Sequence, residues 1–254
     1  MLTFATELAR RAGAVLLEGL NNRPEVELKG SFEVVTEIDR ASEKLIVESI
    51  HAYAPDHAIL AEEGSGIEQA SEYLWLVDPL DGTNNYAHSF PYFSVSIALL
   101  HKRELYLGVV YDPTRDELFA AQRGQGAWCN NRPIQASNIT SLAAALVSTG
   151  FSYNYAQLTN NNLQEFDRVQ SQCHGVRRAG SAALDLAYVA CGRLEAHWEY
   201  RLQPWDSAAG ATLVLEAGGK LTTLEGKAWT PWSNSIVASN THIHAELHQV
   251  LDAA

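Results

Sequence analysis

Acidic side chains end two apolar segments of the chain. Residues 58–61 run directly into Glu62, and residues 73–77 run into Asp78 and then, three residues later across a proline, Asp81. Short apolar runs of this kind are typical of buried β-strands. If the two strands are neighbours in one sheet, their acidic ends come together, and carboxylates that repel each other are tolerated where a cation lies between them. The pattern therefore indicates a cation site built from oxygen ligands.

A fourth acid, Asp206, precedes a run of small residues at positions 207–210. An acid in this position is typical of a helix N-cap, and small residues also let a ligand approach the backbone at the positive end of a helix. Hard oxygen donors with no Cys or His among them favour Mg²⁺ over Zn²⁺. We therefore expect Mg²⁺ as the cofactor, held by Glu62, Asp78, Asp81 and Asp206.

Two glycine-containing segments are candidates for contact with a substrate. Gly82 permits a left-handed backbone directly after Asp81, and it places the Thr83 hydroxyl beside the acids. A hairpin turn would explain the dipeptide Asp81-Gly82 equally well. A second segment, residues 180–183 (GSAA), opens a helix whose free backbone amides are a candidate anion cradle. The residues that we expect to contact substrate from these segments are Gly82, Thr83, Gly180, Ser181 and Ala182, together with Asp206.

The charge of the chain limits its partners. Its 254 residues include 18 Lys and Arg against 30 Asp and Glu, a formal net charge of −12. The overall field repels nucleic acids, anionic membranes and phosphate alike, and no apolar run reaches the ~20 residues that span a membrane. We expect no nucleic-acid and no membrane partner, and a small phosphate-bearing substrate would need a local cation.

The cysteines and the N-terminus indicate a compartment. Cys129, Cys173 and Cys191 are widely spaced and form no CxxC pair, which argues against a disulfide framework. The N-terminal segment is typical of an amphipathic helix and lacks a signal-peptide pattern. We therefore expect the protein in the cytoplasm.

The order of the expected elements changes near residue 140. The first half has helices at the N-terminus and at residues 42–53, an extended segment at 32–36, and an antiparallel meander over residues 94–134. In the second half strands alternate with helices. The strands are expected at 144–148, 194–200, 220–224 and 236–238, and the helices at 181–191, 206–217 and 242–251. We predict an α+β half over residues 1–140 that carries the metal-binding motifs, and an α/β half over residues 141–254 that completes the active site.

Three segments resemble the signatures of the inositol monophosphatase family. They are WLVDPLDGTNNY at residues 75–86, Glu62-Glu63, and WDSAAGATLVLEAGG at residues 205–219, and their order and spacing fit over essentially the whole chain. The resemblance implies a layered α-β-α-β-α sandwich, a homodimer, and Mg²⁺-dependent, Li⁺-sensitive hydrolysis of a small phosphate monoester, with myo-inositol monophosphate as the first candidate. It also implies metal ligands at Glu62, Asp78, the Leu80 carbonyl, Asp81 and Asp206.

The resemblance further implies which residues activate the attacking water. Thr83 and Asp39 match positions associated with this step, so Thr83, hydrogen-bonded to Asp39 or placed beside Glu62, would orient a water and help to remove its proton. Two metals about 3.5–4 Å apart would stabilise the attacking and leaving oxygens. Asp39 precedes a helix expected from near Ala41, and it could also cap that helix. Glu33 stands where the family often has Asp, and its longer side chain favours a solvent-facing strand residue over a role around the metal.

Glu199 is the candidate for substrate choice. It lies in the strand-like run 194–200, just before the helix that carries Asp206. The matching position in inositol monophosphatases contacts the inositol hydroxyls, and a carboxylate there would also repel a second phosphate. The alternative for Glu199 is a surface residue at a strand end.

Other functions remain as alternatives. Neither a GxxxxGK[ST] motif nor a GxGxxG turn after a strand is present, so nucleotide-triphosphate and dinucleotide binding lack their phosphate cradle. Related phosphatases acting on histidinol phosphate, fructose 1,6-bisphosphate or adenosine 3',5'-bisphosphate are the competing activities. A non-catalytic regulatory relative is the alternative from another class, and the presence of every required acid argues against it.

Overall fold

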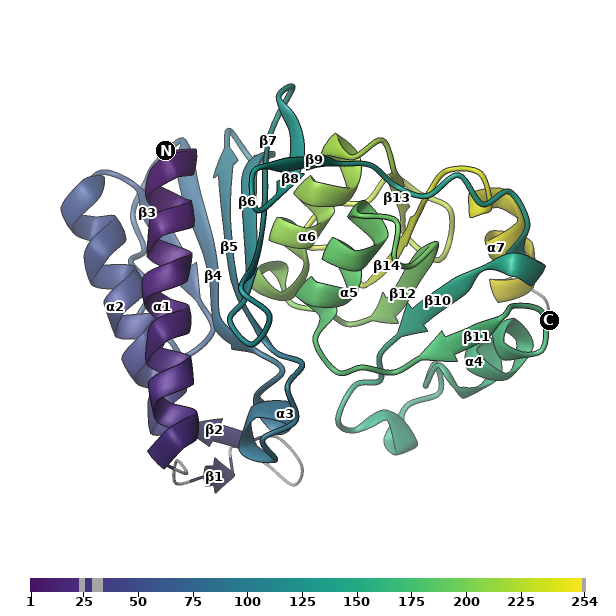
Figure 1. The fold of residues 1–254 in the computed structure, drawn as a ribbon, viewed down its shortest axis with the longest axis horizontal. Coiled ribbons are helices and arrows are strands. Elements are labelled where there is room, and N and C mark those ends of the chain that lie inside the picture. The colour runs from purple at the N-terminus through teal and green to yellow at the C-terminus, as the bar shows by residue number, and fades with distance from the viewer. Residues whose placement is uncertain (23–25, 29–33, 253–254) are drawn as a thin grey trace.

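Two β-sheets alternate with three layers of helices in the molecule (Figure 1). The structure is a computed structural model that describes residues 1–22, 26–28 and 34–252. Glu33, with the Lys29–Phe32 segment before it, lies outside the described residues. Within the described residues, no helix is long and apolar enough to cross a bilayer.

The first layer consists of α1 (Leu2–Asn22) and α2 (Glu37–Tyr53), which cover one face of a seven-stranded sheet. Apolar side chains of the two helices, among them Leu8, Leu16 and Ile46, pack against Trp75 and Val77 of the sheet. The strands of this sheet, in spatial order, are β3 (Ala58–Ala61), β4 (Tyr73–Asp81), β5 (Ser94–His101), β6 (Glu104–Asp112), β7 (Glu117–Gln122), β8 (Gly126–Cys129) and β9 (Arg132–Ile134). A separate small ribbon pairs β1 (Val26–Leu28) with β2 (Val34–Thr36).

The middle layer consists of α5 (Ala182–Ala190) and α6 (Pro204–Glu216), which are packed between the two sheets. Because both of their faces are covered, these helices are rich in small apolar residues such as Ala187, Ala208 and Ala209. The second sheet has the order β11 (Gly175–Arg177), β10 (Leu146–Thr149), β12 (Ala196–Tyr200), β14 (Ser235–Ser239) and β13 (Lys220–Thr222). Its outer face is covered by α4 (Leu163–Gln170) and α7 (His244–Leu251). Shorter helical turns are α3 (Thr83–Ala87), η1 (Leu142–Ala144) and η2 (Tyr155–Gln157).

The layered α-β-α-β-α sandwich predicted from the sequence is confirmed, as is the meander, since β5 to β9 pair only in antiparallel fashion. The first sheet is nevertheless mixed, because β3 and β4 pair in parallel. The helix expected from residue 42 was placed too late: α2 begins at Glu37, so Asp39 lies in its first turn and does not precede it. Strand β11 and helix α4 were not expected from the sequence. The division into two domains near residue 140 stays a prediction.

Candidate active site

The parallel pairing of β3 and β4 brings two acidic strand ends together. Ala61 is the register partner of Val77, so Glu62 and Asp78 follow directly on neighbouring strands. The register of β4 against β5 shifts between Asp78 and Asp81, which adds a local bend to the strand. Asp78 is 3% exposed and Asp81 9% exposed.

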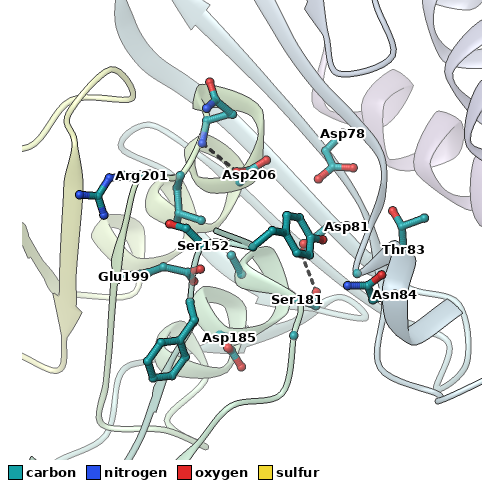
Figure 2. A pocket seen from close by; sticks show the side chains of 18 of the residues that line it. Asp78, Asp81, Thr83, Asn84, Ser152, Ser181, Asp185, Glu199, Arg201 and Asp206 are labelled. Carbon is teal, nitrogen blue, oxygen red and sulfur yellow. Dashed lines mark hydrogen bonds between the residues drawn. The ribbon is translucent and has the colours of Figure 1, made fainter. Parts of the chain in front are cut away.

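These acids line a pocket of about 930 Å³ (Figure 2). The pocket is lined by Glu62, Asp78, Asp81 and Asp206 from the expected cation site, and by Glu199 from β12. The expected substrate-contacting residues Gly82, Thr83, Gly180, Ser181 and Ala182 also line it, as does Leu80. Folding therefore gathers residues from both halves of the chain around one cavity.

The carboxyl groups of the pocket repel one another. Burial, the charges of Glu62, Asp81 and Asp206, and a hydrogen bond with Glu62 raise the pKa of Asp78 well above its usual range. Burial and the charge of Glu62 raise the pKa of Asp206 in the same way. Repulsion of this kind is relieved by a cation, and a donor set of oxygens alone suits Mg²⁺. The residues present therefore fit a magnesium site. Among the described residues, no three Asp, Glu, His or Cys side chains converge closely enough to form a ready-made metal site.

Asp81 is held by the start of helix α5. Its Oδ2 accepts hydrogen bonds from the Ser181 hydroxyl at 2.5 Å and from the Ala183 amide at 2.8 Å. Burial raises the pKa of Asp81 to about 6, although these two hydrogen bonds favour its charged form. The segment predicted as a cradle for a substrate anion therefore holds the protein's own carboxylate, because the positive end of α5 lies within reach of the β4 terminus.

Thr83 links the end of strand β4 to helix α2. Its hydroxyl lies 3.1 Å from Asp39 Oδ1 and 3.0 Å from the Leu80 carbonyl oxygen, and it can donate its hydrogen to either. Gly82 before it has a φ of 98°, and a Cβ there would lie 3.1 Å from the Gly180 carbonyl oxygen. A side chain at residue 82 would therefore be strained as well as crowded. Asp39 itself is 1% exposed and does not line the pocket, so its link to the site is the Thr83 hydroxyl.

Helix α2 also positions the loop after β3, through a residue that the sequence analysis missed. Glu43, 1% exposed, accepts hydrogen bonds from the Glu63 amide at 2.6 Å and from the Ser65 amide at 2.9 Å. The residue before Glu43, Ser42, donates its hydroxyl to the Pro79 carbonyl oxygen at 3.1 Å. The only available signal was an acid on the apolar face of a predicted helix. Glu43 thus fixes the backbone next to Glu62.

Asp206 is not the N-cap that the sequence suggested: the N-cap of α6 is Gln203, and Asp206 is the third helical residue, completing a capping box. It lies in the first turn of α6, where its Oδ2 accepts a hydrogen bond from the Gln203 amide at 2.8 Å, and it faces the pocket (Figure 2). On the other side, Ser96 of β5 donates to the Trp205 carbonyl oxygen at 3.0 Å. The start of α6 is therefore fixed to the first sheet, with one carboxylate oxygen of Asp206 committed to the helix.

Glu199 is not a surface residue. Its side chain is only 13% exposed and points into the pocket from β12 (Figure 2). Among the cationic side chains, Arg178 and Arg201 also line this cavity. The surface alternative for Glu199 is therefore wrong.

The acid cluster predicts how stability depends on pH in the absence of metal. The raised pKa of Asp78 means that the folded chain holds this proton more tightly than the unfolded chain, whose aspartates titrate near pH ~4. The free energy of unfolding should therefore fall as pH rises above about 4, and Asp78→Asn should escape that loss. We expect the free energy of unfolding of the variant, measured by urea denaturation, to exceed that of the wild type by about 1 kcal/mol or more at pH 7.5. The two proteins should be equally stable near pH 4. An equal difference at both pH values would contradict the assignment of the repulsion to this carboxylate.

Comparison with known proteins agrees with this geometry. The Inositol monophosphatase family matches residues 1–254. An inositol-1-monophosphatase of Synechocystis is 44% identical over 99% of this chain and 88% of its own length. A Nus factor SuhB of Pseudomonas aeruginosa is 44% identical over 95% of this chain and 92% of its own length. The structure of an inositol monophosphatase from Anabaena superimposes with a TM-score of 0.90 at 45% identity, covering 98% of this chain and 94% of that one.

The fold, the acidic pocket and these relatives define a phosphoric monoester hydrolase. The chain belongs to the inositol monophosphatase family.

Proposed function

We propose that this protein hydrolyses a polyol monophosphate, with myo-inositol monophosphate as the first candidate, in a reaction that depends on Mg²⁺. The observation that carries the proposal is one pocket in which four mutually repelling carboxyl groups face Glu199 across the cavity. The first group suits a divalent cation and the phosphate that it binds, and Glu199 suits an alcohol with several hydroxyls.

The residues that would hold Mg²⁺ are Glu62, Asp78, the Leu80 carbonyl, Asp81 and Asp206. When bound, the ion supplies positive charge to the phosphate oxygens and lowers the pKa of a water molecule. It also offsets the negative field of a chain with a net charge of −12, which otherwise repels the substrate.

Thr83 and Asp39 support removal of a proton from the attacking water. While the Thr83 hydroxyl donates to Asp39, its oxygen remains free to accept a hydrogen bond from water. The negative charge of Asp39 makes that oxygen a better acceptor. As the water proton moves to the Thr83 oxygen, the hydroxyl proton of Thr83 can move to the Asp39 carboxylate, which then holds the proton. Glu62, which lines the pocket, is the other carboxylate that we propose takes part in this step.

Glu199 supports the choice of a monophosphate over a bisphosphate. Its carboxylate can accept hydrogen bonds from vicinal hydroxyls, whereas a second phosphate in the same place would meet its negative charge. Fructose 1,6-bisphosphate and adenosine 3',5'-bisphosphate are therefore the weaker candidates, and histidinol phosphate remains the competing monophosphate. A phosphate-release screen of these esters with Mg²⁺ would rank them directly.

Substitution of Glu199 by glutamine tests this assignment. We expect Glu199→Gln to lower kcat/KM for myo-inositol 1-phosphate by a factor that corresponds to ~1–3 kcal/mol of lost transition-state stabilisation. The reason is that the inositol hydroxyls lose a charged acceptor. Cyclohexyl phosphate has the same ring without hydroxyls, and its hydrolysis should hardly change. The measurement is the ratio of the two kcat/KM values. An equal loss on both substrates would instead assign Glu199 to the metal site or the fold.

Other properties belong to the same proposal. We propose a homodimer that is inhibited by Li⁺, located in the cytoplasm and without a nucleic-acid partner, with a two-domain organisation divided near residue 140. A non-catalytic role is the weaker alternative, because every acid that hydrolysis requires is present in the pocket.

A further inference from the structure

A buried histidine lies directly behind the residue proposed to select substrate. His197 is fully buried in β12, the central strand of the second sheet. Because side chains alternate along a strand, Trp198 packs into the outer core, while His197 and Glu199 share the face turned toward α5 and the pocket. His197 has no contact with the pocket itself, since it does not line it.

Three contacts surround the imidazole. Nδ1 lies 3.0 Å from the hydroxyl of Ser148, its register partner on β10. Nδ1 is also 3.7 Å from Asp185 Oδ2 on α5, and Nε2 is 3.4 Å from Glu199 Oε2. The Nε2 contact is an ion pair without hydrogen-bond alignment, and Nε2 has no other partner among the described residues. One imidazole therefore lies between two carboxylates.

His197 is the basic side chain that contacts both carboxylates. Among the described residues, no Lys or Arg forms an ion pair with Asp185 or Glu199. Burial alone would lower the pKa of His197, but contact with Glu199 and the charge of Asp185 raise it above its ordinary value. Tyr92 donates a hydrogen bond of 2.7 Å to the far oxygen of Asp185, which holds that side of the cluster in place.

The Glu199 carboxylate also lies directly against the backbone of Gly150. A Cβ on Gly150 would lie only 2.1 Å from Glu199 Oε1, so the carboxylate is seated on the space that this glycine leaves open. The Glu199 carboxylate thus contacts both the backbone of Gly150 and the His197 ring. A carboxylate held in this way loses little rotamer freedom when it binds a hydroxyl.

The geometry points to His197 as a positioning residue that holds the Glu199 carboxylate over Gly150, in the orientation that selects hydroxyl-bearing phosphate esters. This inference rests on the proposed role of Glu199. It predicts that His197 influences the choice between substrates without touching either of them.

The test compares four proteins on myo-inositol 1-phosphate and cyclohexyl phosphate with Mg²⁺: the wild type, His197→Phe, Glu199→Gln and the double variant. We expect His197→Phe to lower the preference for the inositol ester by about 3- to 10-fold, mainly through KM. In the Glu199→Gln background the same change should have no further effect on the preference, because the residue through which His197 acts has lost its charge. A full additional loss in the double variant would overturn the proposal.

A conservative variant and a matched control separate positioning from general stability. His197→Gln keeps an N–H donor near the Nε2 position and should recover part of the preference; it also serves if His197→Phe fails to fold. His244→Phe removes another buried imidazole, one that contacts Ser239 and Thr222 and does not line the pocket. It should leave the preference unchanged. The same fall in preference in His244→Phe would overturn the positioning role.

A structural measurement keeps this inference distinct from the proposed function. In a crystal structure of His197→Phe, or of His197→Gln, the Glu199 carboxylate should leave its seat on Gly150 or occupy several orientations. A carboxylate that stays in place would overturn the inference, whatever the substrate. If the carboxylate moves but the wild-type protein shows no preference for the inositol ester, the proposed substrate class fails and the positioning of Glu199 stands.

Discussion

Replacing Asp78 with asparagine should lower the rate of phosphate-ester hydrolysis by at least ~10³-fold, because several kcal/mol of charge stabilisation depend on a bound cation. Removal of divalent metal by a chelator should have the same effect on the wild type, and added Mg²⁺ should restore it. The amide oxygen of the variant can still accept the hydrogen bond that Leu80 donates at 3.0 Å. Measured beside turnover, the free energy of unfolding of the metal-free variant should be higher than that of the metal-free wild type at neutral pH.

The control for this experiment is an aspartate away from the pocket. Asp56 is exposed on the turn before β3 and does not line the pocket, so Asp56→Asn should keep wild-type turnover and the wild-type response to Mg²⁺. Undiminished turnover of the wild type in excess chelator would refute the metal-dependent mechanism. So would a folded Asp78→Asn protein with near wild-type rate.

Thr83→Ala should lower kcat by ~10²-fold or more with little change in KM, since orientation of the attacking water is realised in the transition state. The structure gives the reason: the hydroxyl has two acceptors within reach, Asp39 and the Leu80 carbonyl, and its oxygen is left to accept from water. Thr83→Ser keeps this hydroxyl and should keep most of the activity. Steady-state kinetics on one phosphate monoester at saturating Mg²⁺ provides both constants.

A double variant distinguishes a shared step from two separate roles. If Thr83 and Asp39 act together, Asp39→Asn should also lower kcat, and adding Thr83→Ala to it should cost much less than it does alone. A change confined to KM would show that Thr83 contributes only to the turn that follows β4, whereas fully additive losses in kcat would show that Thr83 and Asp39 act separately.

The sequence by itself identified most of the acids that line the pocket, together with Gly82 and Thr83. Glu62, Asp78 and Asp81 could be found because they interrupt apolar strand patterns, and a strand pattern is a local property with a period of two residues. Gly82 could be found because a left-handed φ is a demand on a single residue. The layered fold came from the order of such elements together with the family resemblance.

Only the tertiary structure decided how these residues are supported. Glu43 and Ser42 look like ordinary positions of an amphipathic helix until α2 is placed against the loop after β3 and the end of β4. Asp81 is 102 residues away from Ala183, the amide that it accepts from, so its occupation of the expected anion cradle could not be read from spacing. His197 looks like one residue of a strand until β10 and α5 bring Ser148 and Asp185 to it. Hydrogen bonds and ion pairs between distant segments depend on how the layers pack, which the local pattern of a sequence does not specify.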